Sequence, residues 1–409
     1  MTRSELSELI YHGENSGVEF KRDKVRPENL AKDIVALANF RGGYILLGVE
    51  DDGTISGLKR EPSKVEEWVM NICRSLVYPP IIPYWEVVRN YEPDKHIGII
   101  FLPSDCPDKP YKVKLGSYWV TYIRVGSTSR EATREEEARL YQSGGLLRYD
   151  LKPVPGTSLS DLDLQRVKNY FEVFREALTP LPQKEKEWIS LLENTEIMAE
   201  SREQPMVTVG GFLLFGKKPH KFLPQCGITA VAYKGEEKDY EVKDEEIIRG
   251  PLVSLFDKQR NIIEAGVIDR AFEFVKRNLK VTTLKDSRRE EDYLLPLEAV
   301  REIIINAVAH RDYTIYSVDI EISIFSNRLE VISPGLLPNT ITVEKIKYGC
   351  RAARNELIRD ILRDYGYIEA RGMGIPYKVL AVLRRLEYPE PEFIEDRDGQ
   401  HFIVKLFYK

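Results

Sequence analysis

Four side chains of types that bind ligands or metal ions recur at four-residue intervals between residues 297 and 313. They are Glu298, Glu302, Asn306 and His310, and most residues between them are apolar. Because residues four apart on an α-helix lie above one another, this spacing places all four on one helix face. Burial of unpaired carboxylates and amides is costly, so the stripe must face a ligand, a metal ion or a polar partner. From the stripe alone, a ligand site and a structural hydrogen-bond network are both open.

The pattern Glu302-x-x-x-Asn306 followed by His310 resembles the N-box of the GHKL ATPases, which include gyrase B, mismatch-repair ATPases, heat-shock chaperones and sensor histidine kinases. The resemblance implies that Asn306 holds Mg²⁺ against nucleotide phosphates and that Glu302 orients the attacking water. With HRDY at 310–313, the stretch is also similar to the GHKL-like domain found behind Schlafen-type domains in predicted prokaryotic regulators. This resemblance spans about residues 295–406.

Two strands are expected next in that fold, and the sequence predicts them at 317–325 and 328–332. The first glycine motif then reads Ser333-Pro334-Gly335, where the family has Asp-x-Gly with a carboxylate that recognises adenine. The resemblance therefore implies a nucleotide site that includes Ser333 and Gly335 but departs from the family at the adenine-reading residue.

Further candidate nucleotide-binding residues follow in the order of the family motifs. Arg354 lies in the segment 349–357, at the place of the nucleotide lid, and Gly372 and Gly374 stand at the second glycine motif. A glycine pair before a helix lets backbone N–H groups approach a phosphate closely. Gly399 precedes the predicted closing strand 403–407.

Acidic residues near the N-terminus form a second candidate site. Glu14, Glu19, Glu50 and Asp51 lie within one short region, and Lys21 follows Glu19 by two positions. Carboxylates gathered near a phosphate-binding surface repel one another, so Mg²⁺ or Mn²⁺ is their expected complement. A structural ion pair between Glu19 and Lys21 is the alternative.

The sequences EFK at 19–21, LANFRGGYILLGVEDDGTISGL at 37–58 and YIRVGST at 122–128 resemble the Schlafen AlbA-type domain over about residues 4–139. Vertebrate Schlafen ribonucleases use two glutamates spaced like Glu14 and Glu19, with a lysine at the position of Lys21. They have an aspartate where this sequence has Glu50, and Asp51 follows one residue later. The resemblance implies catalytic roles for these five residues, with a metal ion held by Glu14, Glu19 and Glu50. Similar EFK domains are known otherwise only as DNA-binding modules.

Basic and aromatic residues of the same region are candidates for nucleic-acid binding. Lysine and arginine neutralise phosphates, while aromatic rings stack on unpaired bases. An ordinary solvated pair of strands is the alternative. The candidates are Lys21, Arg22, Lys112, Lys114, Tyr118, Trp119, Tyr122, Arg124 and Arg130.

The helices and strands expected to position these residues indicate an α+β protein. Helices are expected at 4–11, 27–39, 163–178 with Ser160 as its cap, and 183–200, and strands at 44–49, 207–215 and 226–234. We expect an N-terminal Schlafen AlbA-like α/β domain at 1–150, linker helices and a connecting α/β region at 151–290, and a C-terminal GHKL-like α/β sandwich at 291–409.

Composition is that of a soluble globular protein. The chain has 409 residues, 43% of them hydrophobic and 31% charged, and its formal net charge of -5 argues against a generally cationic surface without excluding a local basic groove. The four cysteines show no metal-binding spacing, and neither a signal peptide nor a membrane span is expected. A cytoplasmic location follows.

Two functions are predicted, together with a non-catalytic scaffold as a third reading. The first is a nucleotide-controlled nucleic-acid-binding protein of the predicted transcriptional regulator type, a homodimer that binds ATP with Mg²⁺, DNA or RNA, and no membrane. The alternative is a metal-dependent Schlafen-type endoribonuclease that cleaves transfer RNA or single-stranded nucleic acid in stress or antiviral defence. The first function would allow an ATPase activity, and the alternative is a nuclease activity.

Overall fold

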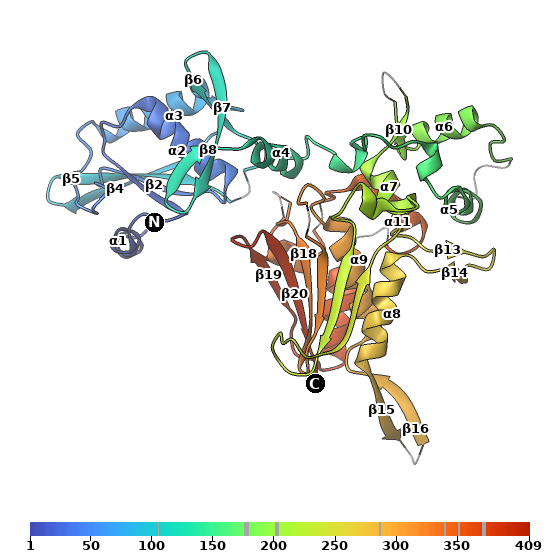
Figure 1. Ribbon diagram of the computed structural model, residues 1–409. Coiled ribbons are helices and arrows are strands. Elements are labelled where there is room, and N and C mark those ends of the chain that lie inside the picture. Colours follow the sequence, from blue (N-terminus) through green and yellow to red (C-terminus); the bar gives the residue numbers. More distant parts are fainter. Residues whose placement is uncertain are drawn as a thin grey trace. The chain divides into compact units, whose positions relative to one another are not determined.

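The chain folds into two compact units, which Figure 1 shows in different colours along the sequence. Unit 1 comprises Met1–Leu147 and unit 2 comprises Arg148–Lys409. The structure is a computed structural model that describes the chain apart from residues 105, 176–179, 201–203, 286–287, 317, 339–340, 351 and 370–373, and apart from the side chains of 282–291. Helices and sheets occur in both units, in agreement with the predicted α+β class. None of the described helices has the length and apolar character of a membrane span.

Unit 1 contains two four-stranded sheets, with strand orders β1-β2-β5-β4 and β3-β6-β7-β8. Helix α2 packs against strands of both sheets. The elements are α1 (Arg3–His12), β1 (Val18–Lys21), α2 (Pro27–Asn39), β2 (Gly43–Leu47), α3 (Pro62–Ser75), β3 (Val77–Tyr78), β4 (Tyr84–Glu92), β5 (Lys95–Leu102), β6 (Lys112–Leu115), β7 (Tyr118–Val125), β8 (Thr128–Glu131) and α4 (Arg134–Ser143).

Helix α2 has the predicted bounds because its sequence carries both a start and a stop signal. Pro27 occupies the first turn, where its missing N–H leaves no bond unmade. At the other end, the N–H of Gly42 donates to the Leu37 carbonyl at 2.8 Å, and Gly42 has a φ of +68°. A side chain at Gly42 would overlap the backbone carbonyls of Leu102 and Pro103, so this turn into β2 requires glycine.

Unit 2 is built around a six-stranded sheet of order β12-β11-β17-β18-β20-β19. Helices α8 and α9 contact each other and pack on this sheet, as Figure 1 shows. The elements are α5 (Leu164–Asn169), η3 (Tyr170–Phe174), α6 (Glu185–Asn194), β9 (Met198–Ala199), β10 (Met206–Val207), α7 (Val209–Phe215), β11 (Ile228–Tyr233), β12 (Val242–Ile248), β13 (Leu255–Phe256), β14 (Ile262–Glu264), α8 (Val267–Leu279), β15 (Lys280–Lys285), β16 (Arg288–Tyr293), α9 (Leu297–His310), β17 (Ile320–Ile324), β18 (Arg328–Pro334), α10 (Val343–Lys347), α11 (Glu356–Asp364), η5 (Gly374–Ala381), α12 (Val382–Arg385), β19 (Glu392–Asp396) and β20 (His401–Phe407).

The central sheet joins segments that are distant in sequence. Strand β11 pairs in parallel with β17, with Ile228 opposite Ile320, and antiparallel with β12. Residues of the expected connecting region and of the expected C-terminal domain therefore share one sheet and one hydrophobic core. Two antiparallel neighbours, β18 and β20, complete the part of the sheet that faces α9.

The structure corrects three predictions in unit 2. The helix expected at 183–200 ends at Asn194, and Met198–Ala199 forms the short strand β9. The segment 207–215 is not one strand, because Val209–Phe215 forms helix α7, in which the Thr208 hydroxyl caps the first turn by accepting from the Gly211 N–H at 3.1 Å. All seven helix residues are buried, so the sequence shows no periodicity that separates a helix from a strand. Helix α5 is capped by Asp163 and not by Ser160. After α5 the chain continues as the π-helix η3, which ends at Phe174.

Replacement of Gly42 by alanine should destabilise unit 1 strongly. The added Cβ atom combines an unfavourable positive φ with overlap against two carbonyl groups, so we expect a loss of about 2 to 5 kcal/mol in unfolding free energy. Urea unfolding followed by tryptophan fluorescence measures it, since Trp68, Trp85 and Trp119 lie in unit 1.

The matched control is Gly116→Ala, at a φ of +60° with open space around the position. Only the backbone term applies there, which amounts to about 1 to 2 kcal/mol. Equal losses at both positions would contradict the steric argument.

Candidate functional site

The polar face of α9 lines a cavity in unit 2. Glu302, Asn306 and His310 all border this cavity of about 150 Å³, whereas Glu298, one turn earlier, is exposed and lies outside its lining. The other walls are largely apolar and come from β18, β19, β20, η5 and residues of the segments 335–338, 341–350 and 352–353. Three consecutive turns of one helix thus present hydrogen-bonding groups to a largely apolar space.

Glu302 and Asn306 are hydrogen-bonded to each other. The Asn306 Nδ2 atom donates to the Glu302 backbone carbonyl and to its Oε1 atom, both at 2.7 Å. Burial raises the pKa of the Glu302 carboxyl, while Asn306 and the charge of Lys378 act in the opposite direction. The Lys378 ammonium lies 3.9 Å from Glu302 and 2.9 Å from Glu369. The amide oxygen of Asn306 remains available to a ligand.

Gly374 brings bare backbone against this carboxylate. It is the first residue of η5 and borders the cavity, and a side chain there would overlap the Glu302 carboxylate. The close packing of η5 on α9 therefore depends on glycine at this position. Gly372, the other candidate of this motif, lies outside the described residues.

His310 closes the C-terminal end of the polar face. Burial, together with the positive charges of Arg354 and Arg359, lowers the pKa of its imidazole to about 4. Since this value is far below neutrality, His310 is uncharged at neutral pH and offers one nitrogen donor and one nitrogen acceptor.

Ser333 and Gly335 lie on the cavity wall opposite α9. The Ser333 hydroxyl donates to the Ala307 carbonyl at 2.9 Å and so ties β18 to the helix. Gly335 has a φ of +110°, and a side chain there would overlap Asp312 and the Arg354 guanidinium. Arg354 itself donates to the Leu336 carbonyl at 2.5 Å and lies behind the cavity wall.

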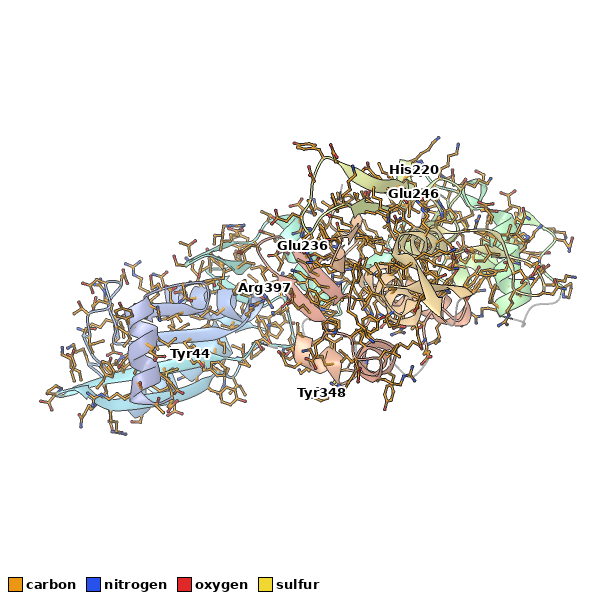
Figure 2. All side chains as sticks on the ribbon, turned by 90° about the horizontal axis from the view of Figure 1, so that it is seen from below. Tyr44, His220, Glu236, Glu246, Tyr348 and Arg397 are labelled. Carbon is orange, nitrogen blue, oxygen red and sulfur yellow. The ribbon has the colours of Figure 1, made fainter. Side chains whose placement is uncertain are left out.

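Gly399 is placed away from the cavity. It is exposed in the turn between β19 and β20, where its N–H donates to Asp396 at 3.1 Å. Tyr348, labelled in Figure 2, precedes Gly349 and Cys350 of the cavity wall and is 85% exposed. Of the described residues in the predicted nucleotide set, the structure therefore brings Glu302, Asn306, His310, Ser333, Gly335 and Gly374 together at the cavity and leaves Arg354 and Gly399 outside its lining.

The HRDY sequence has a structural role at the end of α9. The Arg311 guanidinium is fully buried and donates to the carbonyls of Asp312 and Ile315 at 2.7 and 3.0 Å. Asn355 donates from its amide to the Ala309 and Arg311 carbonyls at 3.0 and 2.9 Å. The bonds of Asn355 thus satisfy the carbonyls of Ala309 and of the C-cap Arg311, which the helix itself leaves unpaired, and those of Arg311 hold the loop that follows α9.

Sequence reasoning missed three charged residues at the cavity. Arg359 and Glu369 border it, and Lys378 reaches Glu302 from η5. The signal was weak, since Arg359 and Lys378 have the spacing of ordinary surface charges on helical segments. Their relation to α9 arises only from the packing of α11 and η5.

In unit 1, the carboxylate of Glu19 is neutralised by two cations. It lies 2.5 Å from the Arg124 guanidinium and contacts the Lys21 ammonium at still shorter range. Lys21 also lies 3.5 Å from Asp33, a buried residue of α2 that accepts from Ser129 at 2.8 Å and that sequence reasoning missed. Glu19 is therefore the counterion of a buried charge cluster.

Of the other candidate carboxylates, Glu14 lies near Glu19, whereas Glu50 is paired elsewhere. Glu14 accepts from the Phe20 N–H at 2.9 Å, and burial and the neighbouring charge of Glu19 raise its pKa despite that hydrogen bond. Glu50 pairs with Arg22 at 3.2 Å, and Asp51 is exposed. In the described part of the chain, no three His, Cys, Asp or Glu side chains are grouped so as to hold a metal ion. This donor set does not fit a metal ion.

Most candidate nucleic-acid-binding cations are paired with carboxylates. Besides Lys21, Arg22 and Arg124, Lys112 contacts Glu137 at 2.7 Å and Arg130 contacts Glu136 at 2.8 Å. Tyr122 is half-buried, with the Lys32 ammonium 5.4 Å from its ring.

One cation of this set stands among exposed rings. The ammonium of Lys114 lies 5.9 Å from the Trp119 ring, and the rings of Trp119 and Tyr78 are 5.6 Å apart. Tyr118 is 76% exposed on the same hairpin.

Three family models match the chain. Residues 14–133 match the Schlafen AlbA_2 family, residues 318–406 match a HATPase_c_4 family described as "Putative ATP-dependent DNA helicase recG C-terminal", and residues 139–228 match a domain of unknown function. No curated protein matches the sequence.

Two solved structures show partial likeness. A crystal structure of a protein from Corynebacterium diphtheriae is 19% identical, with a TM-score of 0.47, over 99% of this chain and 80% of that one. The N-terminal domain of a RecG-related protein from Nitrosomonas europaea is 24% identical, with a TM-score of 0.24, over 32% of this chain and 90% of that one.

Replacement of Glu19 by glutamine should destabilise unit 1. The change leaves Arg124, whose side chain is fully buried, without its counterion, and we expect a loss of about 3 to 5 kcal/mol in unfolding free energy. Urea unfolding of the full chain, followed by tryptophan fluorescence, measures this. In the control Glu50→Gln, the lost partner Arg22 is exposed, so the change should stay below about 1 kcal/mol. A stable Glu19 variant would argue against the counterion role.

The stability of unit 2 should depend on pH through His310. Below pH 6.5 the unfolded chain binds a proton that the folded state accepts only near pH 4, so stability is complete above this window and is lost as the pH falls through it. At about pH 5 the loss should be about 2 kcal/mol relative to neutral pH. Urea unfolding of the wild type and of His310→Gln at both pH values isolates this contribution, since the variant lacks it. Identical pH dependence in the two proteins would refute it.

Proposed function

Because the chain joins a Schlafen AlbA_2 domain at residues 14–133 to a HATPase_c_4 domain at residues 318–406, we propose that it is a nucleotide-controlled nucleic-acid-binding protein. Unit 2 binds ATP or a related nucleotide, and unit 1 binds DNA or RNA. In line with the GHKL resemblance, we also propose that it acts as a homodimer.

The observation that carries the nucleotide-binding part is the polar face of α9 on the cavity of unit 2. Glu302, Asn306 and His310 supply polar groups along one wall, and mostly apolar side chains supply the others. This combination suits a ligand with an apolar aromatic part and a polar part, as a nucleotide has. The absence of a side chain at Gly374 leaves backbone beside the carboxylate.

Each polar residue has a definite role in this proposal. Two hydrogen bonds to Glu302 orient the Asn306 amide, whose oxygen would hold a Mg²⁺ ion. Bound Mg²⁺ neutralises phosphate charge. The raised pKa of Glu302 favours proton acceptance from an attacking water, and Lys378 limits that rise.

Base selectivity should be weaker than in ATPases with an aspartate at the first glycine motif. Ser333 stands at that position, and its hydroxyl proton is committed to the Ala307 carbonyl. Its oxygen can still accept a hydrogen bond. Both ATP and GTP are therefore appropriate test ligands.

The nucleic-acid-binding part of the proposal rests on the outer face of the β6–β7 hairpin. Lys114 and the exposed rings of Tyr78 and Trp119 combine a cation with surfaces on which bases stack. Nuclease activity has less support, since Glu19 is committed to Arg124 and Lys21 and the described carboxylates do not form a metal site.

Nucleotide binding should require Asn306. Titration of the purified full chain with ATP or GTP in the presence of Mg²⁺, measured by calorimetry, should show binding by the wild type and at least about a tenfold loss of affinity in Asn306→Ala, because the oriented amide oxygen is removed. Glu302→Gln should retain binding while slowing hydrolysis.

Glu298→Gln is the matched control, since Glu298 belongs to the same stripe but is exposed and outside the cavity lining. It should bind nucleotide like the wild type. Binding that survives in Asn306→Ala, or that is lost equally in Glu298→Gln, would refute the assigned site.

A further inference from the structure

Helix α4 lies over the outer face of the sheet β3-β6-β7-β8. The strand register places Lys112, Lys114, Trp119, Thr121 and Arg130 on this face, because Lys112 is opposite Thr121, Lys114 is opposite Trp119, and Arg130 is opposite Ile123, two residues beyond Thr121. The other face of the same strands is directed to α2. The outer face is therefore rich in cations.

The first turn of α4 is acidic and neutralises part of this face. Glu137 contacts Lys112 and accepts from the Thr121 hydroxyl, both at 2.7 Å. Glu136 forms a two-pronged pair with Arg130 at 2.8 and 2.9 Å. Two carboxylates thus occupy positions beside the two cations where phosphate oxygens would bind.

Helix α4 packs weakly on the sheet. The helix buries only Gln142, and both amide atoms of that side chain lack a hydrogen-bond partner. An unsatisfied buried amide opposes docking. The ion pairs that remain are partly exposed, with Arg130 at 45% and Glu137 at 33%, and such pairs contribute little to stability.

The rest of the cationic face is open. Lys114, Trp119 and Tyr78 lie beyond the contacts of α4 and are exposed. The Schlafen AlbA_2 match also ends at residue 133, the N-cap residue of α4, so the helix lies outside the matched domain. The face is thus divided into a part covered by acidic side chains and a part accessible to a ligand.

We propose that α4 is an electrostatic cover which single-stranded nucleic acid displaces, so that its phosphates replace Glu136 and Glu137 on Arg130 and Lys112 while its bases stack on Trp119 and Tyr78. This inference rests on the proposed nucleic-acid binding of unit 1 and adds its regulation. The open rings provide the first contact, and the covered cations are reached when α4 leaves.

The two carboxylates keep their charge at neutral pH, which makes the cover a competitor of phosphate. The hydrogen bond from Arg130 lowers the pKa of Glu136, and Lys112 and Thr121 outweigh burial to lower the pKa of Glu137. In the covered state each cation already has a counterion, so phosphate binding releases fewer salt ions than it would from free cations.

The test removes the charge of the cover without removing the helix. The double variant Glu136→Gln and Glu137→Gln retains a glutamine at the third position of the capping box with Thr133. Binding of a labelled single-stranded oligothymidylate to the full chain, measured by fluorescence anisotropy, should tighten about tenfold at low salt. The plot of log K against log salt should steepen by roughly 1 to 1.5.

Glu135→Gln is the matched control. Glu135 belongs to the same turn, and its replacement also removes a negative charge. It is exposed, and it does not contact Lys112, Thr121 or Arg130. Trp119→Ala in the double variant should reverse most of the gain if bases stack there. Circular dichroism and thermal unfolding verify that each variant is folded.

The possible results separate this inference from the function on which it rests. If neither the wild type nor the double variant binds single-stranded or double-stranded nucleic acid, both the proposed nucleic-acid binding and the cover are wrong. If the wild type binds but the double variant binds no more tightly than Glu135→Gln, only the cover is refuted. Preference for double-stranded over single-stranded probes in every variant would overturn the stacking on Trp119 and Tyr78.

Discussion

The C-terminal end of helix α9 is fixed by buried hydrogen bonds, and the cavity of unit 2 depends on this constraint. A helix leaves its last carbonyls without intrahelical donors, and a buried end must find donors elsewhere. Asn355 supplies two, to Ala309 and Arg311, and Arg311 binds the carbonyls of the following loop. Because these bonds set the position of α9, they also set where Asn306 and His310 face the cavity.

In unit 1, a buried charge must likewise find partners, as the buried carbonyls do in unit 2. Arg124 is buried completely, and its desolvation is compensated by Glu19 together with the backbone oxygens of Asn15 and Val18. These bonds connect β7 to β1 and to the turn that precedes β1. Glu19, which resembles a residue of the Schlafen ribonucleases, is here engaged in holding two segments together.

The sequence was sufficient for features with strong local signals and insufficient for those that depend on packing. Helix α2 was predicted to the residue because Pro27 and the Gly42 turn mark its ends, and the stripe from Glu298 to His310 correctly gave helix α9. Helix α7 was missed because every one of its residues is buried. The spacing of Glu14 and Glu19 says nothing of Arg124, which lies more than a hundred residues away and determines the state of Glu19. The contact of Lys378 with Glu302 and that of α4 with Lys112 also depend on packing between segments that are distant in sequence.

Control of nucleic-acid binding by nucleotide requires an element with two arrangements of similar free energy. In the proposed cover helix α4 is this element, because its ion pairs are partly exposed and its buried Gln142 is unsatisfied. It also ends at Ser143, shortly before unit 2 begins at Arg148, so the chain that leaves the helix leads directly to the unit for which nucleotide binding is proposed. A nucleotide shifts the equilibrium of α4 only by the difference of its affinities for the covered and uncovered forms. Ordinary allosteric coupling amounts to about 1 to 3 kcal/mol, and a helix held by partly exposed ion pairs is an element on which a coupling of that size can act.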